Sequence, residues 1–349
     1  MSLPDSLDAI ASKPPDVPEQ AIAEHLSARY GLQGELTPLV SERDQNLRLR
    51  TAGGDSYVVK IANVAEAECV TRFQVSALLH LEDRTCPVAV PRVVRSADGG
   101  ALTSFVFDDT AFRLRVVTWV DGRAIEGRVP DAELAHALGR SLAAIDRALS
   151  DFEHEGQGQS LLWDMQRAAD LRQLVHYIAD AGLRRVVEST LDDFETIALP
   201  ALSHLRRQVI HNDLNPGNVL VAPNDPTRVA GVIDFGDMLR APLVVDVAIA
   251  IAYLRSFEED PLAPLTSFVS GFHSVLPFED EEAGLLYDLL RTRLVTTITM
   301  LHWREAARSG EDEYLRKALA ERSSERFLER INAISRAEFL GRMSEALRR

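Results

Sequence analysis

Two acids and an amide lie close together along this chain: Asp213, Asn218 and Asp234. An amide and a carboxylate placed side by side offer the oxygen ligands that suit Mg²⁺, which keeps several waters and shares the phosphates of a substrate. A third side chain, a carboxylate that stays off the metal, can orient an attacking hydroxyl and accept its proton. These groups together predict phosphoryl transfer from a nucleoside triphosphate.

A β-hairpin is predicted to hold these side chains in place. The β-rich runs 219–222 and 228–234 flank the sequence PNDPT at 223–227, whose residue types favour a turn. Asn218 and Asp234 are equidistant from the second proline of that sequence, so folding there brings them together at the open end. Acids are common where chains reverse, and one alone would mean little. Three ligand-type residues around one hairpin favour a catalytic site.

The part of the chain before residue 120 is predicted to form an antiparallel sheet with one helix packed on it. Glycine turns between β-rich runs indicate strands, and apolar residues at helical spacing indicate helices, one of which ends at Gly31. The expected elements are strands within 47–61, 91–106 and 111–120 and helices over 18–32 and 68–83.

The rest of the chain is predicted to be mainly helical. An amphipathic helix is expected over 131–149 with Asp131 as its N-cap, and helical character dominates 161–207 and the region after 243. The fold class is therefore α+β with two lobes. The expected divisions are a flexible tail at 1–16, a nucleotide-binding N-terminal lobe at 17–120, and a C-terminal lobe at 121–349 that contains the hairpin and the acceptor site.

Composition limits the possible partners. The formal charge of −15 disfavours nucleic acid and an anionic membrane, since their phosphates attract basic surfaces. It is compatible with a cationic small molecule, although such a charge also serves solubility. The two cysteines lack C-x-x-C spacing, the N-terminus lacks the features of a signal peptide, and no apolar run is long enough to span a bilayer. We therefore expect a cytoplasmic protein.

Two segments around the hairpin carry a family resemblance. IHNDLNPGNVLV (210–221) and VIDFGD (232–237) resemble the catalytic loop and metal-binding segment of protein-kinase-like phosphotransferases, in the form of the aminoglycoside phosphotransferase family. LVSERDQNLRL (39–49) and LLWDMQRA (161–168) are most similar to its hydroxylysine-kinase-like branch. The resemblance spans about residues 20–300. It implies a protein-kinase-like bilobal fold, small-molecule kinase activity, Mg²⁺, and ATP or GTP as donor.

The resemblance implies roles for the matching residues. Asp213 matches the catalytic carboxylate, and Asn218 and Asp234 match the magnesium ligands. His211 matches the histidine that braces the catalytic loop, and Lys60 the lysine that contacts the phosphates of the nucleotide.

Further residues match the rest of the nucleotide site. Ser41, Asp44 and Asn46 lie in the hairpin loop expected to cover the phosphates, although SERDQN replaces a glycine-rich loop there. The backbone of Thr118, Trp119 and Val120 matches the link between the lobes, which would hydrogen-bond the purine.

The sequence departs from many protein kinases at two positions. Asn215 stands where they have a lysine, so a positive charge on the transferred phosphoryl group is missing. The acid expected to pair with Lys60 aligns with Gln74, and either Gln74 orients that lysine or Glu66 or Glu68 does. Two further acids are assigned apart from the site. Asp246 is expected to hold the catalytic loop from below, and Asp237 is either a supporting acid or a plain loop acid.

Three functions remain in competition. The first is a kinase that phosphorylates a hydroxylated amine or amino acid, supported by the branch resemblance and the acidic balance. The second is phosphorylation of an aminoglycoside, which the mixed, slightly basic C-terminal sequence disfavours. The third is a nucleotide-binding pseudokinase, which the missing helix acid favours and the intact Asp213, Asn218 and Asp234 disfavour.

Overall fold

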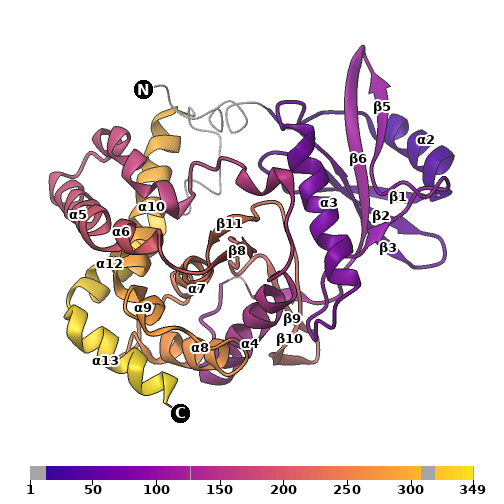
Figure 1. Ribbon diagram of the computed structural model, residues 1–349. Helices are drawn as coiled ribbons and strands as arrows, with labels where there is room; N and C mark the ends of the chain where they lie inside the picture. Colours follow the sequence, from indigo (N-terminus) through magenta and orange to yellow (C-terminus); the bar gives the residue numbers. More distant parts are fainter. Residues whose placement is uncertain (1–12, 126, 308–318, 349) are drawn as a thin grey trace.

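The chain folds into a sheet-rich N-terminal lobe and a larger helical C-terminal lobe, as predicted (Figure 1). The computed structural model describes residues 13–125, 127–307 and 319–348. The expected tail at 1–16 lies outside these residues up to position 12. Among the described residues, no helix combines the length and the apolar character needed to cross a membrane.

One antiparallel sheet forms the frame of the N-terminal lobe. Its strands run in the order β1-β2-β3-β6-β4, and β5 also pairs with β6. The helices α2 and α3 cover opposite sides of the sheet (Figure 1). The bounds are α2 Glu19–Tyr30, β1 Gly34–Leu39, β2 Gln45–Thr51, β3 Ser56–Ile61, α3 Glu68–Glu82, β4 Val93–Val94, β5 Thr103–Phe107 and β6 Thr110–Thr118.

The side-chain alternation of the strands gives this sheet an apolar face and a basic face. Leu47, Leu49, Val59 and Ile61 point to the apolar face, where they form a core with Ile22 and Leu26 of α2. The intervening residues point the other way. Lys60 therefore shares the second face with Arg48 and with its cross-strand neighbour Arg115. The alternation alone directs Lys60 toward the C-terminal lobe.

The C-terminal lobe is built from helices around one large core, which also takes up the apolar side of α3. As predicted, Asp131 caps α4, its side chain accepting a hydrogen bond from the Leu134 amide at 2.9 Å. The helices are α4 Ala132–Ala148, α5 Ala181–Asp193, α6 Leu199–Leu202, α7 Leu243–Ile251, α8 Ala263–His273, α9 Asp280–Ala283, α10 Leu286–Ala307, α12 Ser323–Asn332 and α13 Arg336–Leu347.

The catalytic hairpin consists of β9 (Val219–Ala222) and β10 (Asp225–Val232), with the short strand β7 (Arg123–Ala124) beside β9. The predicted turn at 223–227 is too long, because β10 begins at Asp225 and only two residues separate the strands. Two register shifts in β10 absorb the difference. The bulged strand still ends level with the start of β9.

The segment 161–207 differs from its expected helical form. It begins with short 3₁₀ turns, Met165–Gln173 and Val175–Tyr177, and regular helix starts only at α5. The Asp164 carboxylate accepts the Gln166 amide at 3.0 Å, which favours a tight turn over a continuing helix. The segment ends in β8 (Arg207–Ile210), which pairs with β11 (Leu239–Pro242). This pair flanks the catalytic loop on both sides in sequence.

Candidate active site

Asp213 lies on the loop between β8 and β9, and two amides fix its orientation. Its Oδ2 accepts hydrogen bonds from Asn215 Nδ2 and Asn218 Nδ2, both at 2.8 Å. The Asn215 Oδ1 in turn accepts the Gly217 and Asn218 amides at 2.7 and 3.2 Å. No hydrogen bond from the described residues reaches Asp213 Oδ1. One oxygen of the carboxylate is therefore held in place and the other is free to accept a proton.

The hairpin brings Asn218 and Asp234 to its open end, as the sequence predicts. The carbonyl of Asn218 accepts the Ile233 amide at 2.9 Å, one residue before Asp234. Asn218 Nδ2 is held by both the carbonyl and the carboxylate of Asp213, which turns its Oδ1 away as the remaining acceptor. Asp234 has φ of 61°, a conformation unfavourable for a residue with a side chain. The hairpin holds this strained residue beside Asn218.

Lys60 on β3 forms an ion pair with Asp234, its Nζ lying 3.2 Å from Oδ1. The charge of Lys60 is the main reason that the pKa of Asp234 is held far below its usual range; burial opposes the shift, and Arg43 adds to it. The carboxylate is thus ionised across the physiological pH range. A lysine from one lobe and an acid from the other meet at this point.

The prediction that Gln74, Glu66 or Glu68 orients Lys60 is wrong. Among the described residues, no hydrogen bond or ion pair joins Lys60 to Gln74, Glu66 or Glu68. Gln74 is buried and instead accepts from Arg115 Nη2 at 2.6 Å and donates to the Gly236 carbonyl at 3.3 Å. Because a neutral amide cannot compensate a cation, Lys60 pairs with the nearest ionised acid, on the hairpin.

Two residues of the loop expected to cover the phosphates have structural contacts instead. Asp44 accepts the Asn63 amide at 3.2 Å and pairs with Arg115 at 3.2 Å, so it braces the loop. Asn46 lies in β2 rather than in the loop, directly opposite Lys60. Only residues 40–44 separate β1 from β2. Within this loop, Ser41 forms no hydrogen bond with the described residues, and Arg43 turns toward the acids.

His211 braces the catalytic loop. The Asp213 amide donates to its Nδ1 at 3.3 Å, and its Nε2 lies 3.2 Å from the Ile233 carbonyl. These two contacts select the neutral tautomer with the proton on Nε2, and burial lowers the pKa of His211. Its geometry suits a brace between loop and hairpin, not a chemical base.

Asp246 holds the same loop from below. Its two oxygens accept the amides of His211 and Asn212, each at 2.8 Å. Asn212 has φ of 65°, and its side chain donates to the Asp237 carbonyl at 2.9 Å. The position of Asp213 therefore depends on a buried acid at the start of α7.

Asp237 joins three parts of the site. It forms an ion pair with Arg43 of the β1–β2 loop, and it accepts from Trp163 Nε1 at 3.0 Å. The Arg43 guanidinium also lies over the Trp163 ring, 5.4 Å from its centre. Burial raises the pKa of Asp237, and Arg43 opposes that rise. Asp237 is thus a site acid near Asp213, which decides between the two roles left open by the sequence.

Comparisons of sequence and structure identify the family of this chain. The profile of the phosphotransferase enzyme family (APH) matches residues 35–277. The chain belongs to this phosphotransferase family. It is 26% identical over 330 residues to a hydroxylysine kinase of Xenopus laevis, covering 88% of each chain, and 25% identical over 338 residues to that of Bos taurus, covering 90% of each.

Solved structures share the fold of this phosphotransferase. An amicoumacin kinase in complex with AMP-PNP, Ca²⁺ and the ligand Ami has a TM-score of 0.68 at 18% identity, covering 90% of this chain and 94% of that one. A microcompartment-associated aminopropanol kinase has a TM-score of 0.61 at 16% identity, covering 95% and 99%. The protein-kinase-like fold, the family and the classification as a small-molecule kinase are therefore confirmed.

The link between the lobes of the phosphotransferase follows β6. The amides of Thr118 and Trp119 already donate to the carbonyls of Arg92 and Ser56, at 2.9 and 3.1 Å. The Trp119 ring packs against Arg48, whose guanidinium lies 4.2 Å from the ring centre. Of the three expected link residues, Val120 is the one whose backbone amide these contacts leave without an acceptor.

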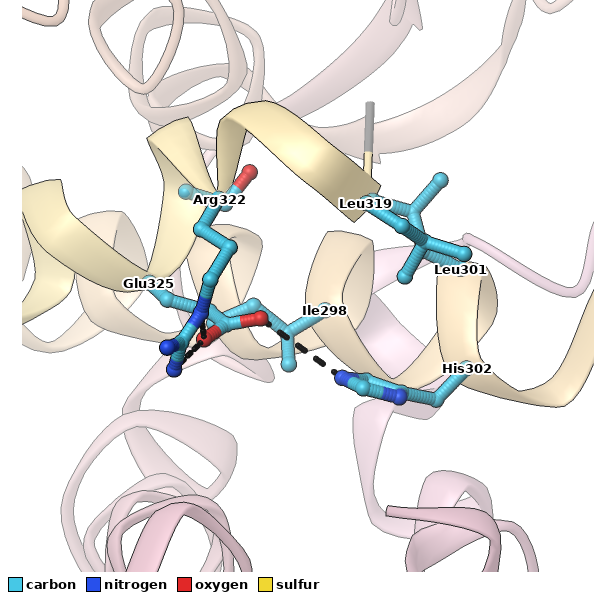
Figure 2. Close-up of a pocket in the computed structure, with 7 residues that line it drawn as sticks. Ile298, Leu301, His302, Leu319, Arg322 and Glu325 are labelled. Carbon is cyan, nitrogen blue, oxygen red and sulfur yellow. Dashed lines mark hydrogen bonds and ion pairs between the residues drawn. The ribbon is translucent and has the colours of Figure 1, made fainter. Parts of the chain in front are cut away.

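A small hollow of the phosphotransferase lies apart from this site. Figure 2 shows it between the end of α10 and the start of α12, with His302 and Arg322 both directed at Glu325. It includes none of the residues assigned to nucleotide, metal or catalysis. We therefore do not place the acceptor there.

Several residues of the site were not predicted. Arg43 lies in the segment expected to cover the phosphates, but no local sequence pattern predicts its contact with Asp237. Asp146 of α4 and Arg293 of α10 are charged residues that lie three or four positions from apolar residues, on the buried sides of their helices. Such a charge is the signal that could have singled them out, because buried charges need a partner or a function.

Proposed function

We propose that this phosphotransferase uses Mg²⁺ to transfer the γ-phosphoryl group of ATP or GTP to a hydroxyl of a hydroxylated amine or amino acid. One observation supports this above all: Asp213, Asn218 and Asp234 meet at the end of one hairpin, and Lys60 of the other lobe reaches the same point. Phosphoryl transfer depends mainly on positioning and charge stabilisation, and this arrangement supplies both.

The residues present fit a magnesium ion. Asn218 uses its nitrogen on Asp213, which leaves the amide oxygen as a ligand, and Asp234 is ionised at physiological pH. An amide and a carboxylate oxygen are the few protein ligands that Mg²⁺ usually takes beside phosphates and waters. When bound, the ion neutralises charge that develops on the phosphates.

The side chains of the two lobes divide the remaining tasks. Lys60 is placed to hold phosphate oxygens, because its ammonium already lies beside the metal-site acid Asp234. In its ionised form, Asp213 offers its unpaired Oδ1 to the acceptor hydroxyl and takes the proton as the new P–O bond forms and the bond from the γ-phosphorus to the departing nucleoside diphosphate breaks. Asn215, which replaces the lysine of many protein kinases, orients Asp213 through its 2.8 Å hydrogen bond.

The acceptor class is inferred from the acids around Asp213 and from the relatives. Asp237 lies beside the catalytic acid and pairs with a cation in this structure, so it can pair with a substrate ammonium instead. Relatives named hydroxylysine kinase match along about nine-tenths of the chain. A hydroxylated amine or amino acid is therefore the acceptor class that we expect.

An acceptor screen tests the proposal. Purified protein, Mg²⁺ and ATP or GTP would be incubated with hydroxylysine, simple amino alcohols, an aminoglycoside and a sugar, and phosphorylated product detected by mass spectrometry. We expect product with a hydroxylated amine or amino acid and none from the Asp213→Asn variant. Product from the aminoglycoside or the sugar alone would overturn the acceptor class, and equal nucleotide turnover by wild type and variant would overturn the kinase assignment.

A further inference from the structure

A buried arginine on α10 forms no ion pair within the part of the chain that the structure describes. Arg293 is 6% exposed, its Nη2 donates to the Tyr253 hydroxyl at 3.0 Å, and its Nε is buried with no hydrogen-bond partner. Among the described residues, no carboxylate forms an ion pair with it. Burying a charge without a direct counter-ion costs several kcal/mol of stability. Packing alone is therefore a poor explanation for this arginine.

A neighbour on the same helix provides the contrast. Arg291 is similarly buried, but its donors are occupied: Nη1 pairs with Asp193 at 2.6 Å, and Nε donates to Asn332 at 2.8 Å. That pattern is typical of a structural arginine that joins α10 to α5 and α12. Arg293 lacks it and retains donor capacity.

Arg293 lies near the catalytic acid. Tyr253, whose hydroxyl accepts the hydrogen bond from Arg293, lines a small cavity together with residues 214–216, which follow Asp213 in the catalytic loop. In agreement with this position, burial raises the pKa of both Asp213 and Asp237, and the charge of Arg293 acts to lower both. The guanidinium is therefore within electrostatic reach of both acids without contacting either.

The helix face that carries Arg293 points toward the junction of the lobes. Arg304 lies eleven positions further along α10, about three turns, and hence on the same face. Its guanidinium pairs with both oxygens of Glu42 in the β1–β2 loop, at 2.9 and 2.8 Å. One end of this face thus meets the N-terminal lobe, and the other end lies beside Tyr253, near the catalytic loop.

The lysine proposed to bind the phosphates, Lys60, reaches the site from the N-terminal lobe, and Arg293 reaches it from the C-terminal lobe. Lys60 approaches Asp234 from β3, whereas Arg293 reaches the neighbourhood of the catalytic loop from α10, where it contacts Tyr253. A molecule whose hydroxyl lies at Asp213 would meet an acid, Asp237, and an unpaired cation, Arg293. An ammonium and a carboxylate on one molecule complement that pair, and guanidinium groups bind carboxylates well.

We propose that Arg293 binds the carboxylate of the acceptor while Asp237 binds its ammonium, so that the acceptor is a hydroxylated amino acid and not a plain amino alcohol. This inference rests on the proposed function and specifies its substrate class.

A matched pair of acceptors tests it. Hydroxylysine and its decarboxylated diamine alcohol differ only in the carboxylate, and kcat/KM for each would be measured with wild type and with Arg293→Met. A charged hydrogen bond contributes about 10- to 100-fold. We expect the variant to lose about that factor for hydroxylysine and less than about threefold for the diamine alcohol. Arg293→Lys, which keeps the charge in the fold, should recover part of the preference.

Arg291→Met on the same helix is the control, and it should lower Tm without changing the ratio between the two acceptors. A ratio that is also unchanged in Arg293→Met and Arg293→Lys, with wild type active on both acceptors, would overturn the carboxylate role and leave the proposed kinase function standing. A wild type that phosphorylates neither acceptor would overturn the proposed acceptor class and this inference together.

Discussion

Lys60 Nζ lies 3.2 Å from Asp234 Oδ1, joining the central strand β3 of the N-terminal lobe to the catalytic hairpin of the C-terminal lobe. The lysine side chain is 15% exposed and the aspartate 48%, so the pair is open enough for a ligand to enter between them. In the proposed reaction this is where metal-bound phosphates bind. In that reaction Lys60 binds the phosphates and Asp234 binds the metal.

Replacing Lys60 with methionine should lower kcat by about 100-fold, because a fixed positive charge beside the transferred group is lost. A partly exposed ion pair contributes about 1 kcal/mol or less to stability. The unfolding midpoint, followed by circular dichroism, should therefore hardly change. A variant that keeps kcat within about threefold of wild type would contradict the phosphate role of this lysine.

The sequence predicts the fold and the core of the site because both depend on local patterns. Strand alternation directs Lys60 to the correct face, and hairpin symmetry brings Asn218 to Asp234. Prediction from the sequence fails where a contact depends on the tertiary packing of residues far apart in the chain. Gln74 was one of three residues expected to orient Lys60, beside Glu66 and Glu68, but its amide oxygen accepts a hydrogen bond from Arg115, 41 positions further along the chain.

The predicted length of the hairpin turn was wrong for a related reason. β-Bulges let β10 start earlier without moving its end, and no simple sequence pattern marks them at Val229 and Gly231. The contact of Arg43 with Asp237 spans 194 positions, so only the packing of the two lobes could reveal it.

Replacing Asp213 with asparagine should abolish turnover and stabilise the ligand-free protein at higher pH. Burial, with Asp237 adding to it, raises the pKa of Asp213 to about 8. The folded protein therefore holds a proton that the unfolded chain releases near pH 4, and the stability from this group is lost as pH rises toward 8. Asparagine carries no such charge.

The measurement is Tm at pH 5 and pH 8 without nucleotide or metal. The variant should gain on wild type by about 1–2 °C at the higher pH, which corresponds to about 1 kcal/mol for a protein of this size. At the lower pH the two proteins should differ less. An equal difference at both pH values would show that the carboxyl of Asp213 is not held protonated.

Asp146 on α4 should also make stability depend on pH. It is fully buried beside Asp246, and no donor from the described residues reaches either of its side-chain oxygens. Burial, then the charge of Asp246, raises its pKa well above the usual value. As a protonated acid it can donate to Asp246, and this stability is lost as pH rises through its folded pKa.

Asp146→Asn should therefore keep a donor for Asp246 at every pH and flatten the fall of Tm on the alkaline side. Asp146→Leu removes the donor and leaves a buried carboxylate short of a partner, which should cost about 1–3 kcal/mol. Because Asp246 holds the amides of His211 and Asn212, the leucine variant should also lower kcat. Identical pH profiles for asparagine and wild type would refute the shared proton.

Arg43 and Asp237 should be coupled energetically, since their ion pair fastens the β1–β2 loop to the catalytic segment and Trp163 packs on both. Arg43→Met and Asp237→Asn should each destabilise the protein. The double variant should be less affected than the sum of the two, with a coupling of about 1–3 kcal/mol from denaturant unfolding. The Glu42–Arg304 pair of the same loop is the control: Glu42 is half-exposed, so we expect a coupling of about 1 kcal/mol or less. Purely additive effects at Arg43 and Asp237 would mean that the loop is held to the site by other contacts.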